Sequence, residues 1–242
     1  MAYGRKYRTP VEALGKPPRR RRPRGSLTRE QVVDAALALA DEQGLEALSM
    51  QNLAGRLDCG VMTLYGYIAD KDDLLDAIAQ TGLRDLRLPR PLPDTLDGIL
   101  IAWGRALRAT LLDHPSLPMI FLARTVIGPG IFRGIEALLG RLTAAGMPAG
   151  AGVHAVYAVL IYTTGFVAWE IPRTHHQPQA AYAAQWRQRL AGLPPSEFPL
   201  AGGVLDELGH VAGEHQFELG LAALTGGLTN GHTPATSRST AS

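Results

Sequence analysis

The first part of the chain carries apolar residues at the spacing of an amphipathic helix. Over residues 28–43 they form one stripe, which consists of Val32, Val33, Ala36, Leu37 and Ala40. Thr28 and Gln31 stand three apart, as in a capping box, and Gly44 stands where a helix commonly ends. The pattern therefore predicts a first helix over residues 28–43.

Two shorter stripes follow within residues 49–68, SMQNLAGRLDCGVMTLYGYI. The first consists of Met50, Leu53, Ala54 and Leu57, and the second of Val61, Leu64 and Ile68. Ser49 can cap the first helix, and residues 58–60, Asp-Cys-Gly, tolerate a tight turn before the second. This arrangement is typical of a helix-turn-helix, whose second helix lies in the DNA major groove. A plain hairpin of two helices has similar apolar spacing and is the alternative.

Helices separated by prolines are predicted for the remaining chain. Asp70 can cap a helix over residues 70–86, which would connect the helix-turn-helix to everything downstream. Pro89, Pro91 and Pro93 then mark a domain boundary. The helices predicted beyond it span residues 94–113, 116–126, 129–145, 148–170, 179–190 and 203–228. No segment shows a convincing strand alternation, so the predicted fold class is all-α.

The charge distribution completes this domain organisation. Residues 1–25 carry nine basic residues and one acidic residue, although the whole chain has a net charge of only +2. Residues 1–26 are therefore predicted to be a disordered basic arm, whose Arg20, Arg21 and Arg22 can reach DNA phosphates or the minor groove. The other predicted parts are a DNA-binding domain at 27–86, a second domain at 94–230 and a flexible tail at 231–242.

The cysteine content and the apolar runs favour a cytoplasmic protein. The single cysteine, Cys59, excludes an internal disulfide and a cysteine-cluster metal site. No apolar run follows the basic N-terminus, so a secretory signal is not expected. The longest apolar run, residues 153–169, contains His154 and Gly165, and we interpret it as a buried helix and not as a membrane span.

Residues 27–83 resemble the DNA-binding domain of the tetracycline-repressor (TetR) family of bacterial transcription regulators. The similarity rests on three linked segments, VVDAALALADEQGLEALSM, LAGRL and TLYGYIADKDDLLDAI, in the order and spacing of that family. Asp58 departs from the glycine usual in the turn, and Gly66 from a larger residue, so no operator sequence is carried over.

The resemblance implies which side chains approach DNA. They are Gln51, Val61, Met62, Thr63, Tyr65, Tyr67 and Lys71. Gln51 can pair with adenine or bond a phosphate, and Lys71 can neutralise a phosphate. Packing of Tyr65 against the first helix is the alternative for that residue.

The second domain resembles the family's sensing and dimerising domain only in layout. That layout implies a homodimer through the helices at 148–170 and 203–228, with candidate interface residues Val156, Leu160, Phe217, Leu221 and Leu224. Two heads would then read successive major grooves of a palindromic operator. Candidate ligand-binding residues are Trp103, His114, Phe121, Tyr157, Tyr162, Phe166 and Trp169, which suit an apolar or amphiphilic molecule if they are not ordinary core.

An enzyme is the competing class. The sequence has no P-loop, nucleophile elbow, zinc helix or dinucleotide fingerprint, and Glu207 with His210 gives only half of a di-iron motif. No cofactor is therefore implied. The predicted function is a ligand-responsive, DNA-binding regulator, most simply a repressor released by a small molecule. The alternative is a helical ligand-binding protein or enzyme with a vestigial DNA-binding part.

Overall fold

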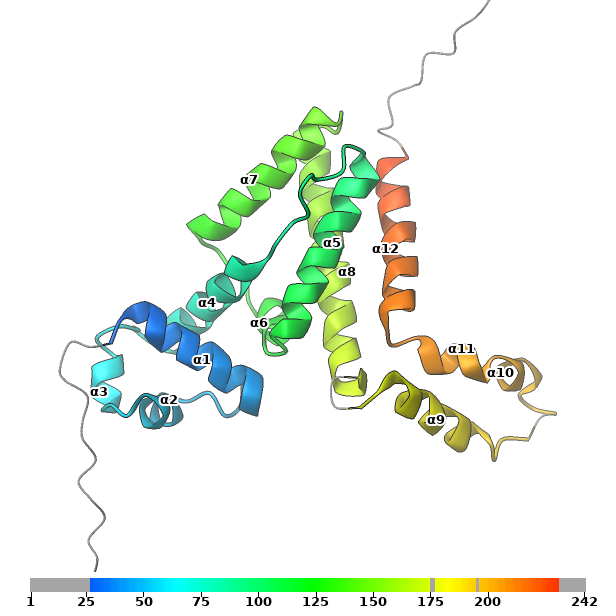
Figure 1. Cartoon of the computed structure of the whole chain (residues 1–242), viewed down its shortest axis with the longest axis horizontal. Helices are drawn as coiled ribbons and strands as arrows, with labels where there is room; N and C mark the ends of the chain where they lie inside the picture. The colour runs from blue at the N-terminus through cyan, green and yellow to red at the C-terminus, as the bar shows by residue number, and fades with distance from the viewer. Residues whose placement is uncertain (1–26, 175–176, 195, 231–242) are drawn as a thin grey trace, which may run out of the picture.

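The computed structural model describes residues 27–174, 177–194 and 196–230, and over these ranges it contains helices and no strand (Figure 1). The predicted all-α class is thus confirmed. The basic arm with Arg20, Arg21 and Arg22 lies outside the described residues, as do the tail at 231–242 and residues 175–176. We call residues 27–82 the head and residues 96–229 the body.

The head contains four helices around a small core. They are α1 (Arg29–Gln43), α2 (Met50–Leu57), α3 (Val61–Leu64) and α4 (Lys71–Gly82). The predicted capping box is present, because Thr28 Oγ1 accepts from the Gln31 backbone N–H and Gln31 Oε1 accepts from the Thr28 N–H. Val32, Leu53, Leu64 and Ile78 come from one helix each and are completely buried, so the four helices share one interior.

The helix predicted over 70–86 is shorter than expected. Asp70 caps α4 as predicted, since its side chain accepts from the Asp73 backbone N–H at 2.8 Å. The α-helix ends at Gly82 and tightens into the 3₁₀ turn η1 (Leu83–Asp85). Leu86 is already extended. The lack of a side chain at Gly82 lets α4 approach the body, because a Cβ there would collide with Leu117.

The body is built around α5 and α8. Its helices are α5 (Leu96–Asp113), α6 (Leu117–Ala123), α7 (Pro129–Ala144), α8 (Ala149–Thr174), α9 (Gln179–Leu190), α10 (Pro199–Gly203), α11 (Leu205–His210) and α12 (Glu214–Thr229). The helix α8 packs against α5, α7 and α12, and α6 lies between α8 and the head helix α4 (Figure 1). The head is thereby seated on one end of the body.

The prediction of one continuous helix over 203–228 is wrong. The structure divides this segment into the end of α10, then α11 and α12, with a break at residues 211–213. Gly213 is extended, with φ −175° and ψ −174°, so the chain changes direction before α12 begins. The preceding α11 packs closely on α9, where a Cβ on Gly209 would lie 2.6 Å from that of Ala183. Helical periodicity alone could not reveal this tertiary contact.

Helix α8 is long and apolar enough to cross a membrane by length and composition. Eight of its 26 residues are nevertheless buried against neighbouring helices, among them Glu170. Glu170 forms a bidentate ion pair with Arg108 of α5, at 2.6 and 3.1 Å, beneath the protein surface. A carboxylate held in this way is typical of a core helix and not of a lipid-facing one.

Candidate nucleic-acid interface and cavity

The turn between α2 and α3 is set by local contacts. Ser49 caps α2 by accepting from the Asn52 backbone N–H at 3.1 Å. Asp58 adopts the left-handed conformation, φ 50° and ψ 48°, and the Cys59 N–H donates to Ala54 O. Aspartate tolerates this conformation better than most residues, so the departure from glycine is accommodated here. The buried Leu64 then anchors α3 on the core.

The candidate DNA-contacting side chains lie at the start of α2, in and just after α3, and at the start of α4. Met62 is 80% exposed and Tyr65 is 48% exposed. Gln51, Thr63 and Lys71 are exposed as well, whereas Val61 and Tyr67 are half-buried against the head core. Exposure leaves the first five free to meet a groove, and Val61 and Tyr67 have less free surface.

Ion pairs hold the head helices in a fixed relation. Arg56 of α2 forms a bidentate pair with Glu42 of α1, at 2.6 and 2.7 Å. These hydrogen bonds lower the pKa of the Glu42 carboxyl from its ordinary value. Arg29 of α1 reaches Asp73 of α4 at 2.6 Å. The orientation of α1, α2 and α4 relative to one another is therefore supported by charge as well as by packing.

Two polar contacts join the head to the body. Asp41 of α1 accepts from the backbone N–H and hydroxyl of Ser116, at 3.0 and 2.6 Å, and lies 2.9 Å from His114 Nδ1. Arg124, which follows α6, contacts Asp72 at 2.7 Å and Asp76 at 3.1 Å on α4. A movement of α6 would therefore either break these contacts or move the head with it.

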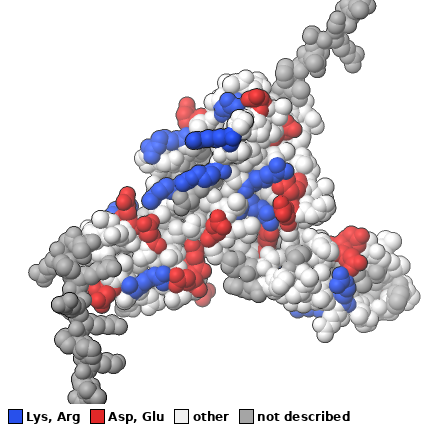
Figure 2. All heavy atoms as spheres, in the orientation of Figure 1, with Lys and Arg blue, Asp and Glu red and all other residues white. Residues whose placement is uncertain are grey.

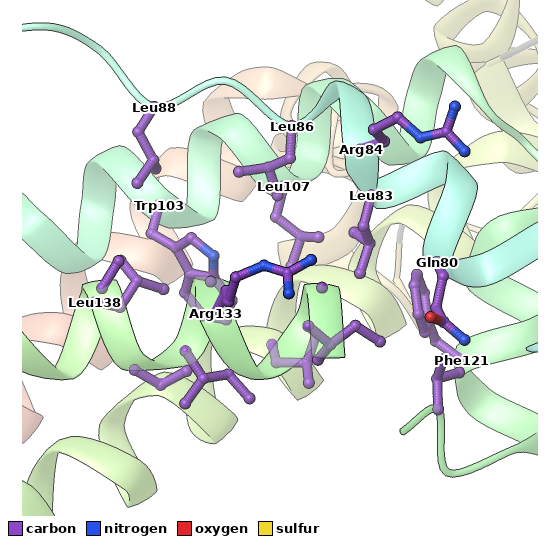
Figure 3. A pocket seen from close by; sticks show the side chains of 18 of the residues that line it. Gln80, Leu83, Arg84, Leu86, Leu88, Trp103, Leu107, Phe121, Arg133 and Leu138 are labelled. Atoms are coloured by element: carbon purple, nitrogen blue, oxygen red, sulfur yellow. The ribbon is translucent and has the colours of Figure 1, made fainter. Parts of the chain in front are cut away.

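A large cavity opens between the α4–α5 connection, α5, α7 and α8. Its volume is 1950 Å³. Trp103 and Leu107 of α5 and Leu138 of α7 contribute to its apolar wall (Figure 3). Gln80, on the head helix α4, lines it as well, so the cavity reaches a helix of the head directly. This space can accommodate a molecule of drug size or larger.

The structure brings together only some of the predicted ligand-binding residues. Trp103, Phe121 and Tyr157 line the cavity. His114 lies at the contact with Asp41, outside the cavity lining.

The other three aromatic candidates lie on α8, and two of them pack against α12. Tyr162 stacks on Phe217 with ring centroids 5.6 Å apart, and its hydroxyl donates to Phe217 O at 2.8 Å. Desolvation raises the pKa of Tyr162. Phe166 meets Phe217 edge-on at 5.3 Å, and Trp169 carries the Arg173 guanidinium over its ring at 4.1 Å. The Tyr162 and Phe166 contacts contribute to the α8–α12 packing, whereas the Trp169 contact lies within α8, and none of the three residues lines the cavity.

The five dimerisation candidates also occupy different environments in the structure. Phe217 and Leu221 are completely buried within the single chain, and Val156 is 2% exposed, so these three offer no surface to a partner. Their inward position follows from the packing of α12 on α5 and α8. Leu160 is half-buried beside the cavity, and Leu224 is half-buried on α12.

Several cavity residues were missed by sequence reasoning. They are Gln80, Arg84, Arg133 and Thr164, which come from four different elements. Their positions follow no regular spacing in the sequence. A polar or charged residue on an amphipathic helix also ordinarily faces solvent, so none of them stood out as a cavity residue. Only the packing of α4, α7 and α8 shows that they converge.

Two family models match successive parts of the chain. A model described as bacterial regulatory proteins, tetR family, matches residues 32–78, and one described as tetracyclin repressor-like, C-terminal domain, matches residues 88–231. An HTH-type transcriptional regulator of Saccharopolyspora erythraea is 32% identical over 218 residues, covering 88% of this chain and 92% of the relative. The HTH-type transcriptional repressor DrrR1 of Streptomyces coeruleorubidus is 31% identical, over 74% of this chain and 62% of its own length.

Solved structures support the same relationship. The TetR family protein ActR of Streptomyces coelicolor, in complex with actinorhodin, superposes with a TM-score of 0.75 at 28% identity. The match covers 87% of this chain and 99% of that one. ActR in complex with (S)-DNPA superposes with a TM-score of 0.72.

Proposed function

The chain belongs to the TetR family of bacterial regulatory proteins, and we propose that it is a homodimeric, cytoplasmic repressor which a small amphiphilic molecule releases from a palindromic operator. Its general activity is that of a ligand-responsive, DNA-binding transcriptional regulator, as its relatives and ligand-bound structural neighbours show. Its named relatives are regulators and not enzymes. The finer proposal concerns the operator, the sign of regulation and the effector.

The observation that carries the proposal is the position of the cavity against the head. Gln80 of α4 and Arg29 of α1 line the same space as Trp103 and Tyr157 of the body. A molecule in this space touches elements on both sides of the head–body junction. It can shift the population of head orientations only if it binds one orientation more tightly than the other.

Helix α4 is the proposed lever between the cavity and DNA. It carries Gln80 at the cavity, Asp72 and Asp76 at Arg124, and Lys71 at the proposed DNA face. These positions lie along a 12-residue helix, which transmits a displacement of one end to the other because it is internally hydrogen-bonded. A displacement at Gln80 would therefore reach the recognition surface.

The proposed DNA contacts are those exposed around α3, with Lys71 as a phosphate contact and Tyr65 as a contact to a base or phosphate. The proposed dimer surface is the outward face of α8 and α12. It carries Leu219 at 58% exposure and the half-buried Leu224 on α12, and Ile161 on α8, which is 67% exposed and also borders the cavity. Apolar side chains this exposed on two long helices are typical of a helical interface.

Selection from random duplexes at two salt concentrations tests the proposal. We expect the purified protein to enrich a palindrome, with an affinity that falls steeply as salt rises. A Tyr65→Ala, Lys71→Ala variant should lose affinity and part of the salt slope. Sequence-blind binding alone would contradict the proposal and favour a ligand-binding protein with a vestigial head. Sedimentation of the DNA-free protein should show a dimer, and a Leu219→Asp variant, which leaves the cavity lining unchanged, should sediment as a monomer.

A further inference from the structure

The cavity lining has an unusual charge balance. Its basic side chains are Arg29, Arg84, Arg87, Arg90, Arg124, Arg133 and Arg141, and its acidic ones are Glu30 and Asp94. Basic side chains lie over α7 and over the connection between α4 and α5 on the face shown in Figure 2. A hollow with apolar walls and basic groups around it favours an occupant that is apolar and negatively charged.

Three of these arginines are already neutralised by carboxylates of the protein. Arg29 pairs with Asp73, and Arg124 pairs with Asp72 and Asp76. Arg141 pairs with Asp94 at 3.0 Å. These ion pairs help to hold α1, α4 and α7 in place, and an acidic ligand would have to compete with the protein's own carboxylates for the three arginines.

Arg133 differs from those three. No acidic side chain in the described part of the chain forms an ion pair with it. It is exposed on α7 at the edge of the cavity, and in Figure 3 its guanidinium group points from α7 toward Leu107 and Leu83. A planar group with five N–H donors in this position matches a carboxylate, sulfonate or phosphate.

A second, independent observation points to an occupant. Thr163 and Thr164 of α8 are buried, and neither hydroxyl has a hydrogen-bond partner among the described residues; of the two, Thr164 lines the cavity. Thr110 and Thr225, on other helices of the body, donate to the carbonyl four residues before them, at 3.0 and 2.9 Å. A buried hydroxyl left unsatisfied costs free energy, which a bound polar group can recover.

We infer that the effector is an anionic amphiphile whose apolar part packs on Trp103 and Leu107 and whose acidic group binds Arg133. This inference rests on the proposed function of the cavity and narrows it to one chemical class. A neutral molecule of the same shape fills the apolar wall but leaves the guanidinium without a partner. A cation is repelled by the surrounding arginines, and this repulsion is stronger than in bulk water because the walls are apolar.

Two fluorescent probes of nearly the same shape test this class. Anilinonaphthalene sulfonate carries a sulfonate, and N-phenylnaphthylamine is its neutral counterpart. We expect the full-length protein to bind the sulfonate about tenfold more tightly than the neutral probe at low salt. Arg133→Gln should remove about tenfold of the sulfonate affinity and change the affinity of the neutral probe less than about twofold.

Arg141→Gln is the matched control. Arg141 lies on the same helix and lines the same cavity, but it is paired with Asp94. This variant should keep the sulfonate affinity within about twofold of the parent protein. Circular dichroism of each variant shows whether α7 remains folded, and only folded variants are compared.

Equal affinity for the two probes, or a sulfonate affinity that does not depend on Arg133, would overturn the inference. Duplex selection with the same preparations separates this result from failure of the proposed function. An enriched palindrome with no preference between the probes would reject the anionic class and leave the regulator in place. A clear preference for the sulfonate without any DNA selection would support the anionic cavity and reject the repressor.

Discussion

The head and the body use their apolar residues differently. In the head, Val32, Leu53, Leu64 and Ile78 meet in an interior without exposed surface. In the body, Trp103, Leu107 and Leu138 face a cavity of 1950 Å³ on one side of α5, while Phe217 and Leu221 fill the other side completely. The head is closed on itself, whereas the body is solid along α12 and hollow along α7.

This difference corresponds to two physical requirements. A reading head must present Met62 and Tyr65 in one geometry, and a close-packed core allows few alternatives. A sensing domain needs space that a molecule can fill and two arrangements of similar free energy. Variants that affect one region and spare the other can test this division, and four are ordered below by expected effect.

The largest effect is expected for a cavity cut into the head core. Leu64→Ala removes a completely buried side chain from α3 and should lower the free energy of unfolding by about 4 kcal/mol. Leu160→Ala removes a half-buried leucine from the wall of an existing cavity and should cost less than about 1.5 kcal/mol, because its neighbours lose fewer contacts. Urea denaturation measures both, and similar costs would contradict the contrast between a solid head and a hollow body.

The solid side of the body should depend on a buried ion pair. Arg108→Met leaves Glu170 buried at 5% exposure without its partner, and we expect a loss of about 3 kcal/mol. Arg105→Met, on the same helix, breaks the exposed pair with Glu218 and should cost less than about 1 kcal/mol. Thermal unfolding at neutral pH compares the two variants. A larger loss in the exposed pair would mean that the α5–α8 contact is not what stabilises this side.

The junction between the regions should respond to Asp41→Asn. This change weakens the bonds from Ser116 and His114 to α1 and should lower the free energy of unfolding by about 1–2 kcal/mol. We also expect two unfolding transitions in place of one, because the head, monitored at α1, then unfolds separately from the body. The neighbouring Glu42→Gln breaks a pair that lies wholly within the head and should leave the two transitions coincident. Coincident transitions in both variants would show that Asp41 does not couple the regions.

The smallest effect is expected for a single phosphate contact. Lys71→Ala should weaken operator binding about fivefold and reduce the slope of log affinity against log salt by about one, because one fewer phosphate is neutralised. Arg105→Ala, which removes a charge from the body, serves as the control and should change neither quantity. Fluorescence anisotropy with the selected duplex gives both values. An unchanged salt slope for Lys71→Ala would place this lysine away from the backbone of DNA.

The parts of the fold predicted correctly depend on neighbours in the sequence. The Thr28 cap, the buried Leu53 and Leu64 and the helix at 179–190 agree with the structure because each is decided within a few turns of chain. The helix predicted over 203–228 was wrong because Gly213 and the α9–α11 contact break it. The aromatic set predicted for one pocket is divided between the cavity, the α12 packing and the head–body junction, since helical spacing does not show which neighbour a face will meet.

By itself, the sequence determined the all-helical class and the helix-turn-helix with Asp58 at its turn. These features follow from apolar periodicity, capping and turn chemistry, which act over short stretches of chain. Only the tertiary structure decided that Arg133, Thr164 and Gln80 meet in one cavity, and that Phe217 is core and not interface. The physical reason is that burial and charge pairing depend on how α4, α7, α8 and α12 pack, and that packing is set by many long-range contacts together.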